Sequence, residues 1–413
     1  MTESEAALTD DKCWKKNTAL FLAGQGLSFF GSMLVSYAIM WHVTLQTQSG
    51  SVMTLFTIAA VLPMFFISPF GGVWADRYNR KLLINISDSV IALVTLFMAL
   101  LLLSGVEHIG LLFVCATVRG FGQGVQMPAV NALIPQIVPE NNLTRINGIN
   151  NSIQSLCTLA SPMLAGAILN AAPIEIILFI DVITAMVGVG ILFFLVKVPN
   201  LVKREKTNAT PANYFQEMKE GLAYIQQRPF IKRLMIFMAI FSVMMAPGAL
   251  LTPLQVTRDF GMEIWRLTAL EIVFSVGMML GGILIGIWGG FKNRVYSMSA
   301  ATLLFGIEAI GLGLLENFWL YLGCMSVLGL TVPLFNTPMM AIFQSKVDAD
   351  YMGRVFSVMS MISSVMMPLG MLVFGPLGDL IAIDWLLIGT GVVTFLMGPL
   401  LAGNKSLREA GQT

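Results

Sequence analysis

The sequence predicts an all-α polytopic membrane protein with twelve transmembrane helices. Of its 413 residues, 56% are hydrophobic and only 11% are charged, and the mean hydropathy is +0.79. Soluble domains carry about 25% charged residues and about 45–50% apolar ones. A water-soluble enzyme, a disordered chain and a secreted disulfide scaffold are therefore excluded. The net charge of +1 gives no sign of nucleic-acid binding.

The apolar residues are grouped into long runs. A helix that crosses a bilayer needs about 20 mostly apolar residues. Twelve stretches meet this requirement: 18–45, 52–74, 82–104, 109–131, 146–171, 174–197, 231–256, 264–290, 295–315, 317–341, 355–379 and 384–403. An even number of spans places the two ends of the chain on the same side of the membrane.

The basic residues indicate which side that is. Of the 24 basic residues, 21 precede the first stretch, fall in or beside the even-numbered connections, or lie in the tail. Arg258 and Arg266 alone lie in or beside an odd-numbered connection, and Arg119 lies within a helix. Because basic loops remain in the cytoplasm, we expect a multi-pass protein of the cell (inner) membrane, surrounded by lipid bilayer, with cytoplasmic N- and C-termini.

The chain is expected to form two bundles joined by a linker. Residues 1–197 form an N-terminal six-helix bundle, and residues 231–413 form a C-terminal one. Residues 198–230 form a cytoplasmic linker, in which YFQEMKEGLAYIQQR spaces its apolar residues as an amphipathic helix. The linker is expected to tether the two bundles, with a regulatory role as the alternative.

The two halves also resemble each other. Arg145 corresponds to Arg354, and the pair Gly71-Gly72 corresponds to Gly281-Gly282. A parallel repeat of six plus six helices, related by an axis along the membrane normal, is typical of one large transporter fold.

The most specific motif is GGVWADRYNRK, between the second and third stretches. Small Gly72 permits close helix packing, Asp76 can accept hydrogen bonds at a helix N-terminus, and Arg80 can pair with it. We expect a conformational latch, with a plain positively charged loop as the alternative. Its members are Gly72, Asp76, Arg77, Arg80, Lys81, Arg145 and Arg354. The motif resembles the loop motif of the major facilitator superfamily, G-x-x-x-D-R-x-G-R-K, with Asn79 in place of the second glycine.

Two further motifs resemble the same superfamily. Arg119 in RGFGQG is similar to the fourth-helix motif R-x-x-x-G-x-G. Ser161, Pro162 and Gly166 in LASPMLAG resemble the antiporter motif G-x-x-x-G-P-x-x-G-G of drug exporters, with Ser161 in place of a glycine. Strings such as QMPAVNALIPQIVPENNLTRINGI and YMGRVFSVMSMISSVMMPLGMLVFG resemble the macrolide-efflux type of exporter. The resemblance implies secondary export of small hydrophobic drugs in exchange for protons, without a cofactor.

Five charged residues lie in the interior of the predicted spans, away from their ends, and such residues are functional candidates. They are Asp88, Arg119, Asp181, Glu271 and Glu308. The resemblance places the fourth, seventh and tenth helices beside the central path and the eighth next to it. We therefore expect proton coupling by Glu271, with Asp181 as second choice and Arg119 assisting. Asp88 is expected to pair with a nearby arginine, and Glu308 to serve helix packing.

The 28 methionines suit a pocket for variable apolar ligands. For any single methionine, ordinary packing or lipid contact is the alternative. The expected substrate path is Gln25, Tyr37, Met127, Phe241, Met245, Gln255, Phe335 and Asn336.

Other classes of function fit less well. An intramembrane enzyme would need catalytic residues or a metal site, and the only histidines, His42 and His108, form no such set. A receptor would need a sizeable ligand or signalling domain, and a channel a filter-like loop. No ATP-binding loop occurs, so an ion gradient must supply the energy. Export of an endogenous amphiphile, such as a siderophore or lysolipid, and substrate uptake by symport stay open. One chain contains both halves, so a monomer suffices.

Overall fold

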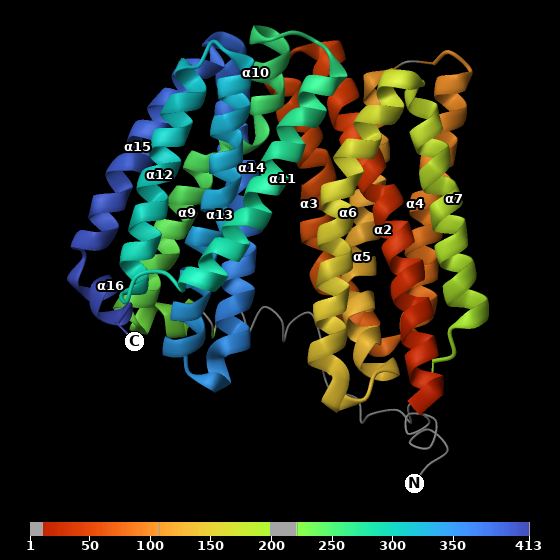
Figure 1. Cartoon of the computed structure of the whole chain (residues 1–413). Coiled ribbons are helices and arrows are strands. Elements are labelled where there is room, and N and C mark those ends of the chain that lie inside the picture. Colours follow the sequence, from red (N-terminus) through yellow and green to blue (C-terminus); the bar gives the residue numbers. More distant parts are fainter. Residues whose placement is uncertain (1–10, 107, 199–219, 221, 413) are drawn as a thin grey trace. The chain divides into compact units, whose positions relative to one another are not determined.

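The computed structural model describes residues 11–106, 108–198, 220 and 222–412. Within this part the regular elements are helices, apart from one isolated bridge between Asn293 and Gln412. The chain divides into two compact units (Figure 1). The first contains Met1–His42 and Phe56–Tyr214, and the second contains Val43–Leu55 and Phe215–Thr413. The assignment of Val43–Leu55 to the second unit is not apparent from the sequence.

Six long helices build the first unit. They are α2 (Asp11–Thr47), α3 (Gly50–Arg77), α4 (Arg80–Leu103), α5 (Ile109–Ile137), α6 (Leu143–Ala171) and α7 (Ile174–Gly190), which continues as the π-helical turn η2 (Ile191–Leu195). Gly105, with φ of 82°, follows the end of α4, and Pro173 precedes the start of α7. Glycine suits the end of a helix because it adopts positive φ, and proline suits the start because no partner for its missing N–H is needed there.

The second unit repeats this arrangement. Its helices are α9 (Pro229–Leu250), α10 (Thr252–Asp259), α11 (Ile264–Trp288), α12 (Arg294–Leu314), α13 (Phe318–Lys346), α14 (Ala349–Leu380), α15 (Ile383–Gly403) and the short α16 (Lys405–Ala410). α12 packs against α13 and α15, α11 against α13, and α9 against α14. α9 and α10 together form one span, interrupted at Leu251 ahead of Pro253.

The helices have the length and composition of membrane spans. In the described part of the chain, eleven are long and apolar enough to cross a bilayer. The remaining predicted span, 109–131, corresponds to α5, which is 29 residues long and contains the polar residues Arg119, Gln123 and Gln126 in its middle. Each predicted stretch lies on a long helix, and the predicted ends differ from the helix ends by at most seven residues. The predicted all-α fold with twelve membrane helices is therefore confirmed.

An internal repeat is visible in matching contacts. Arg80, the first residue of α4, donates at 2.7 Å to the carbonyl of Ala132 on α5. Arg294, the first residue of α12, donates at 2.7 Å to the carbonyl of Ala341 on α13. Each of these helices also follows a capping asparagine. The third span of each unit, α4 in the first and α12 in the second, thus begins in the same way.

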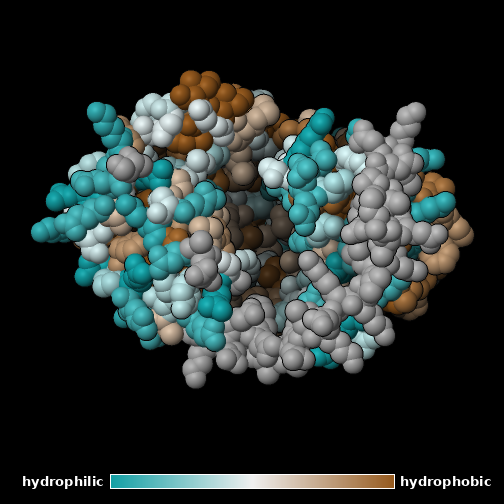
Figure 2. Space-filling model, turned by 90° about the horizontal axis from the view of Figure 1, so that it is seen from below, coloured by the Kyte–Doolittle hydropathy of each residue, from teal (hydrophilic) through white to brown (hydrophobic). Residues whose placement is uncertain are grey.

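Most of the predicted linker, residues 199–219 and 221, lies outside the described residues, whereas residues 222–227 are helical. Figure 2 looks onto the ends of the units where α3 meets α4 and α11 meets α12, and hydrophilic residues gather there.

Candidate functional site

A buried ion pair joins two helices of the first unit. Arg119 of α5 and Asp181 of α7 are 4% and 0% exposed, and Nη1 of Arg119 lies 2.6 Å from Oδ2 of Asp181. Arg119 also donates to the hydroxyl of Thr95 on α4 and, at 3.2 Å, to the carbonyl of Ser32 on α2. The hydroxyl of Ser32 donates to Asp181 at 3.4 Å. Four helices therefore converge on one pair of opposite charges, formed by two of the three predicted coupling residues.

Gly31 allows this convergence. A Cβ atom at Gly31 would overlap the hydroxyl of Thr184 and would lie 3.0 Å from Oδ1 of Asp181. The backbone of α2 can approach α7 this closely only because the residue is glycine.

Asp88 of α4 is buried among amides and a hydroxyl. Its carboxylate accepts hydrogen bonds from Gln126 of α5 and, at 3.4 Å each, from Gln25 and Ser28 of α2. The expectation that Asp88 pairs with an arginine is wrong, because its partners among the described residues are amides and a hydroxyl, and the buried Arg119 pairs with Asp181. One turn earlier, both polar side-chain atoms of Asn85 are buried without a hydrogen-bond partner among the described residues.

The second unit contains an apolar cavity of about 240 Å³. Helices α9 to α14 contribute its lining. Five residues that the sequence singled out meet there: Phe241, Met245, Glu271, Phe335 and Asn336. Leu270, Phe274 and Phe305 also line the cavity and were not predicted, because single apolar residues on membrane helices look alike whether they face lipid or a cavity.

Aromatic rings and one acid define the chemistry of this cavity. The rings of Phe241 and Phe335 stack with centroids 4.5 Å apart, and Phe305 meets Phe241 edge-on at 5.3 Å. Glu271 is the one ionisable side chain among the described lining residues, and no hydrogen bond or ion pair joins it to another described residue. The cavity can thus hold an apolar group beside a carboxyl group that has no partner among the described residues.

Gln255 lies elsewhere in the second unit. Its amide nitrogen donates at 2.7 Å to Asp384 and at 3.0 Å to the carbonyl of Leu312, and its oxygen accepts from the hydroxyl of Tyr321 at 2.8 Å. The residue is 2% exposed. This bonded network is separate from the described cavity lining, and the place of Gln255 in the substrate path stays a prediction.

The remaining predicted path residues belong to the first unit. Gln25 faces Asp88, the ring of Tyr37 lies 5.8 Å from that of Trp41, and Met127 is 39% exposed.

In the second unit, Glu308 of α12 accepts from the hydroxyl of Thr331 at 2.8 Å, and its other oxygen is buried without a partner among the described residues.

The latch motif connects α3 to its neighbours in the first unit. Arg80 reaches Asp76 at 3.5 Å, and Lys81 donates to the carbonyls of Phe193 and Val196 at 2.9 and 2.8 Å. Arg77 is the last residue of α3.

The predicted packing role of Gly72 is wrong. A Cβ atom at Gly72 would meet nothing within 4 Å, whereas one at Gly71 would lie 2.5 Å from the carbonyl oxygen of Gly124 on α5. Gly71 is therefore the residue that lets these two helices approach.

The two arginines that correspond in the repeat lie in different surroundings. Arg145 is exposed on α6. Arg354 pairs with Glu220 of the linker at 3.1 Å, and the rings of Tyr224 and Tyr351 stack 4.4 Å apart. The described end of the linker thus docks on the start of α14.

The third motif lies on the buried face of α6. Ser161, Pro162 and Gly166 are all buried there. The hydroxyl of Ser161 has no hydrogen-bond partner among the described residues. Small side chains at these positions suit close packing of this face.

Comparison with known proteins agrees with this architecture. Residues 21–371 match the model of the Major Facilitator Superfamily. Macrolide efflux protein A of Streptococcus pyogenes is 29% identical over 92% of this chain and 94% of its own length. Macrolide efflux protein A of Enterococcus faecalis is 30% identical over 78% of this chain and 100% of its own length. The staphyloferrin A transporter of Staphylococcus aureus is 24% identical over 89% of this chain and 90% of its own length.

Solved structures show the same fold. The nucleoside transporter NupG matches with a TM-score of 0.68 and 15% identity, over 94% of this chain and 98% of its own. A bacterial homologue of the iron transporter ferroportin matches with a TM-score of 0.69 and 14% identity, over 94% and 99%. The protein is thus a membrane transporter rather than an enzyme, and its chain belongs to the Major Facilitator Superfamily.

Proposed function

We propose that this transporter exports hydrophobic, macrolide-like drugs from the cell in exchange for protons. Similarity to two macrolide efflux proteins over most of the chain supports the direction and the substrate class. Transport would follow alternating access, in which two six-helix bundles expose a midplane site to one side of the membrane and then to the other. The basic connections support cytoplasmic termini.

The cavity of the second unit carries this proposal. Stacked phenylalanines and flexible methionines suit apolar ligands of varied shape. Drug-sized ligands occupy pockets of about 300–1,000 Å³, whereas this cavity measures about 240 Å³. We infer that it takes one apolar part of the substrate, next to Glu271.

Glu271 is also the acid best placed for coupling. A carboxylate that lines an apolar cavity without a counter-charge costs free energy, and binding either a proton or a cationic group of a drug removes that cost. Proton and substrate would then exclude each other at one carboxyl group, which is the requirement for exchange. Asp181 is less suitable, because releasing it would leave Arg119 buried without its partner.

The test is gradient-driven efflux in membrane vesicles with an imposed pH gradient. Glu271→Gln should lose gradient-driven transport and still bind neutral apolar ligands. Glu263→Gln is the matched control, because Glu263 is a glutamate at the start of the same helix, paired with Arg266 outside the cavity. Full transport by Glu271→Gln would remove this residue from the coupling role.

The substrate class needs a separate experiment. A pump-deleted bacterium that expresses this chain should survive higher concentrations of macrolides, and a protonophore should abolish the protection. Export of a siderophore-like amphiphile is the alternative, supported by similarity to the staphyloferrin A transporter. Unchanged macrolide susceptibility with altered siderophore release would favour that alternative.

A further inference from the structure

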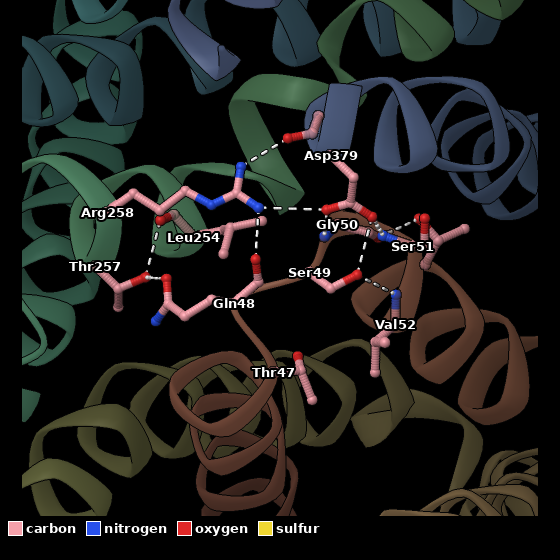
Figure 3. Close-up of polar contacts among 12 residues, drawn as sticks. Thr47, Gln48, Ser49, Gly50, Ser51, Val52, Leu254, Thr257, Arg258 and Asp379 are labelled. Carbon is pink, nitrogen blue, oxygen red and sulfur yellow. Dashed lines mark hydrogen bonds and ion pairs between the residues drawn. The ribbon is translucent and has the colours of Figure 1, made fainter. Parts of the chain in front are cut away.

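The first turn of α3 is capped by a carboxylate from the far end of the chain. Asp379 of α14 accepts hydrogen bonds from the backbone N–H groups of Gly50 and Ser51, at 2.6 and 2.9 Å, and from the hydroxyl of Ser49 at 2.9 Å (Figure 3). Helix N-termini leave such N–H groups unsatisfied and attract negative charge. The usual cap is the side chain directly before the helix. Here the hydroxyl of Ser49 accepts from the backbone N–H of Val52 at 3.3 Å, and Asp379 accepts from the N–H groups of Gly50 and Ser51.

Arg258, near the end of α10, contacts both the connection between α2 and α3 and the end of α14. Its guanidinium donates to the carbonyl of Gly378 at 2.6 Å, to the carbonyl of Gln48, and to the carboxylate of Asp379 at 3.3 Å (Figure 3). The neighbouring Thr257 donates to the side chain of Gln48 at 3.1 Å. One arginine therefore ties the α2–α3 connection, the end of α14 and the capping carboxylate together.

This network gives a reason for an exception in the charge pattern. Arg258 is one of only two basic residues in or beside the odd-numbered connections, which are expected to face outward. The other, Arg266, pairs with Glu263 three residues away on its own segment. Arg258 instead bonds to two segments far apart in the sequence, so its position there has a structural purpose.

The helix backbones also touch beside this network. A Cβ atom at Gly50 would overlap the carbonyl oxygen of Gly375, and one at Gly375 would overlap the hydroxyl of Thr54. That hydroxyl donates to the carbonyl of Met371 at 3.1 Å. Two glycines therefore allow the first turn of α3 to lie directly on α14.

We propose that these contacts form an outer clamp, made of Gln48–Ser51, Arg258, Gly375 and Asp379, which closes the outer side of the substrate path and opens once per cycle. The clamp holds part of Val43–Leu55 in the second unit, although α2 before it and α3 after it belong to the first. Motion of α3 with the first unit must therefore break it. This inference rests on the proposed alternating access.

Labelling from outside the cell tests the clamp. Thr54→Cys, in a background without the four native cysteines, places a thiol at a position that is 2% exposed. A membrane-impermeant maleimide should label it slowly, and about tenfold faster after Asp379→Ala or Arg258→Gln, since each removes several charge-assisted hydrogen bonds. Arg266→Gln is the matched control, because it removes the other outward arginine and should leave the rate unchanged.

A second reporter separates opening from unfolding. Thr302→Cys lies in the interior of α12, 0% exposed, and should stay unlabelled in every variant. Unchanged labelling of Thr54→Cys after both clamp substitutions would overturn the proposal, and so would an equal rise at both reporters. The readout needs neither drug nor proton gradient, so a protein that exports no macrolide could still show the clamp.

Discussion

Replacing Asp181 by asparagine takes away the negative charge that neutralises Arg119 inside the first unit. The two side chains are 0% and 4% exposed, so Arg119 would keep a full charge without a counter-ion. In soluble proteins, removing one partner of a buried pair costs about 3–5 kcal/mol. Arg119 would retain its hydrogen bonds to Thr95 and Ser32, so we expect the lower end, about 3 kcal/mol.

Unfolding in mixed micelles titrated with dodecyl sulfate measures this cost. Asp88→Asn is the matched control, because this aspartate is equally buried on α4 but faces amides instead of a cation, and we expect a loss below about 1.5 kcal/mol. The double variant Arg119→Gln with Asp181→Asn should recover at least about 2 kcal/mol relative to the sum of the single variants. Simple additivity, or an equal loss in the Asp88 control, would refute the view that one ion pair holds these helices together.

Two further substitutions address packing and substrate contact in the second unit. Gly277→Ala should destabilise by about 1–3 kcal/mol, because its Cβ would overlap the carbonyl of Ser326. Gly282→Ala on the same helix meets open space and should be tolerated. Equal thermal stability of the two variants would contradict this expectation. Phe335→Ala removes a ring from the cavity lining and should raise the KM of an exported drug about tenfold with little change in kcat, measured as efflux against substrate concentration; an unchanged KM would exclude the ring from substrate contact.

The helices could be predicted from the sequence because each apolar run determines its own element. A run of about 20 apolar residues has few alternatives in a bilayer. Which side chains meet is a different question, because it depends on how distant helices pack. Arg119 and Asp181 were both recognisable as buried charges, yet nothing in the sequence near either one names its partner.

Small errors in helix rotation account for other differences. Successive residues in an α-helix point about 100° apart, so the choice of Gly72 instead of Gly71 selects the wrong face of α3. Gln255 was recognised as a polar residue in an apolar run, but its bonds to Tyr321 and Asp384 depend on how distant helices pack, which the sequence near Gln255 does not indicate. The clamp at Asp379 escaped prediction because a helix cap is normally sought next to the helix it serves.

Under the proposed proton exchange, the buried charges also limit how many protons each cycle can exchange. Arg119 and Asp181 cancel each other, which leaves Asp88, Glu271 and Glu308 as acids without a basic partner among the described residues. Neighbouring side chains enclose Asp88 and Glu308, which are 2% and 4% exposed, whereas Glu271 lines the cavity that we propose takes part of the substrate. We therefore expect one exchangeable proton.

In vesicles clamped at zero membrane potential, a tenfold proton gradient should then sustain at most about a tenfold substrate gradient, because each factor of ten in either gradient is worth about 1.4 kcal/mol. A gradient near a hundredfold at steady state would require a second acid, and loss of that excess in Asp88→Asn or Glu308→Gln would identify it.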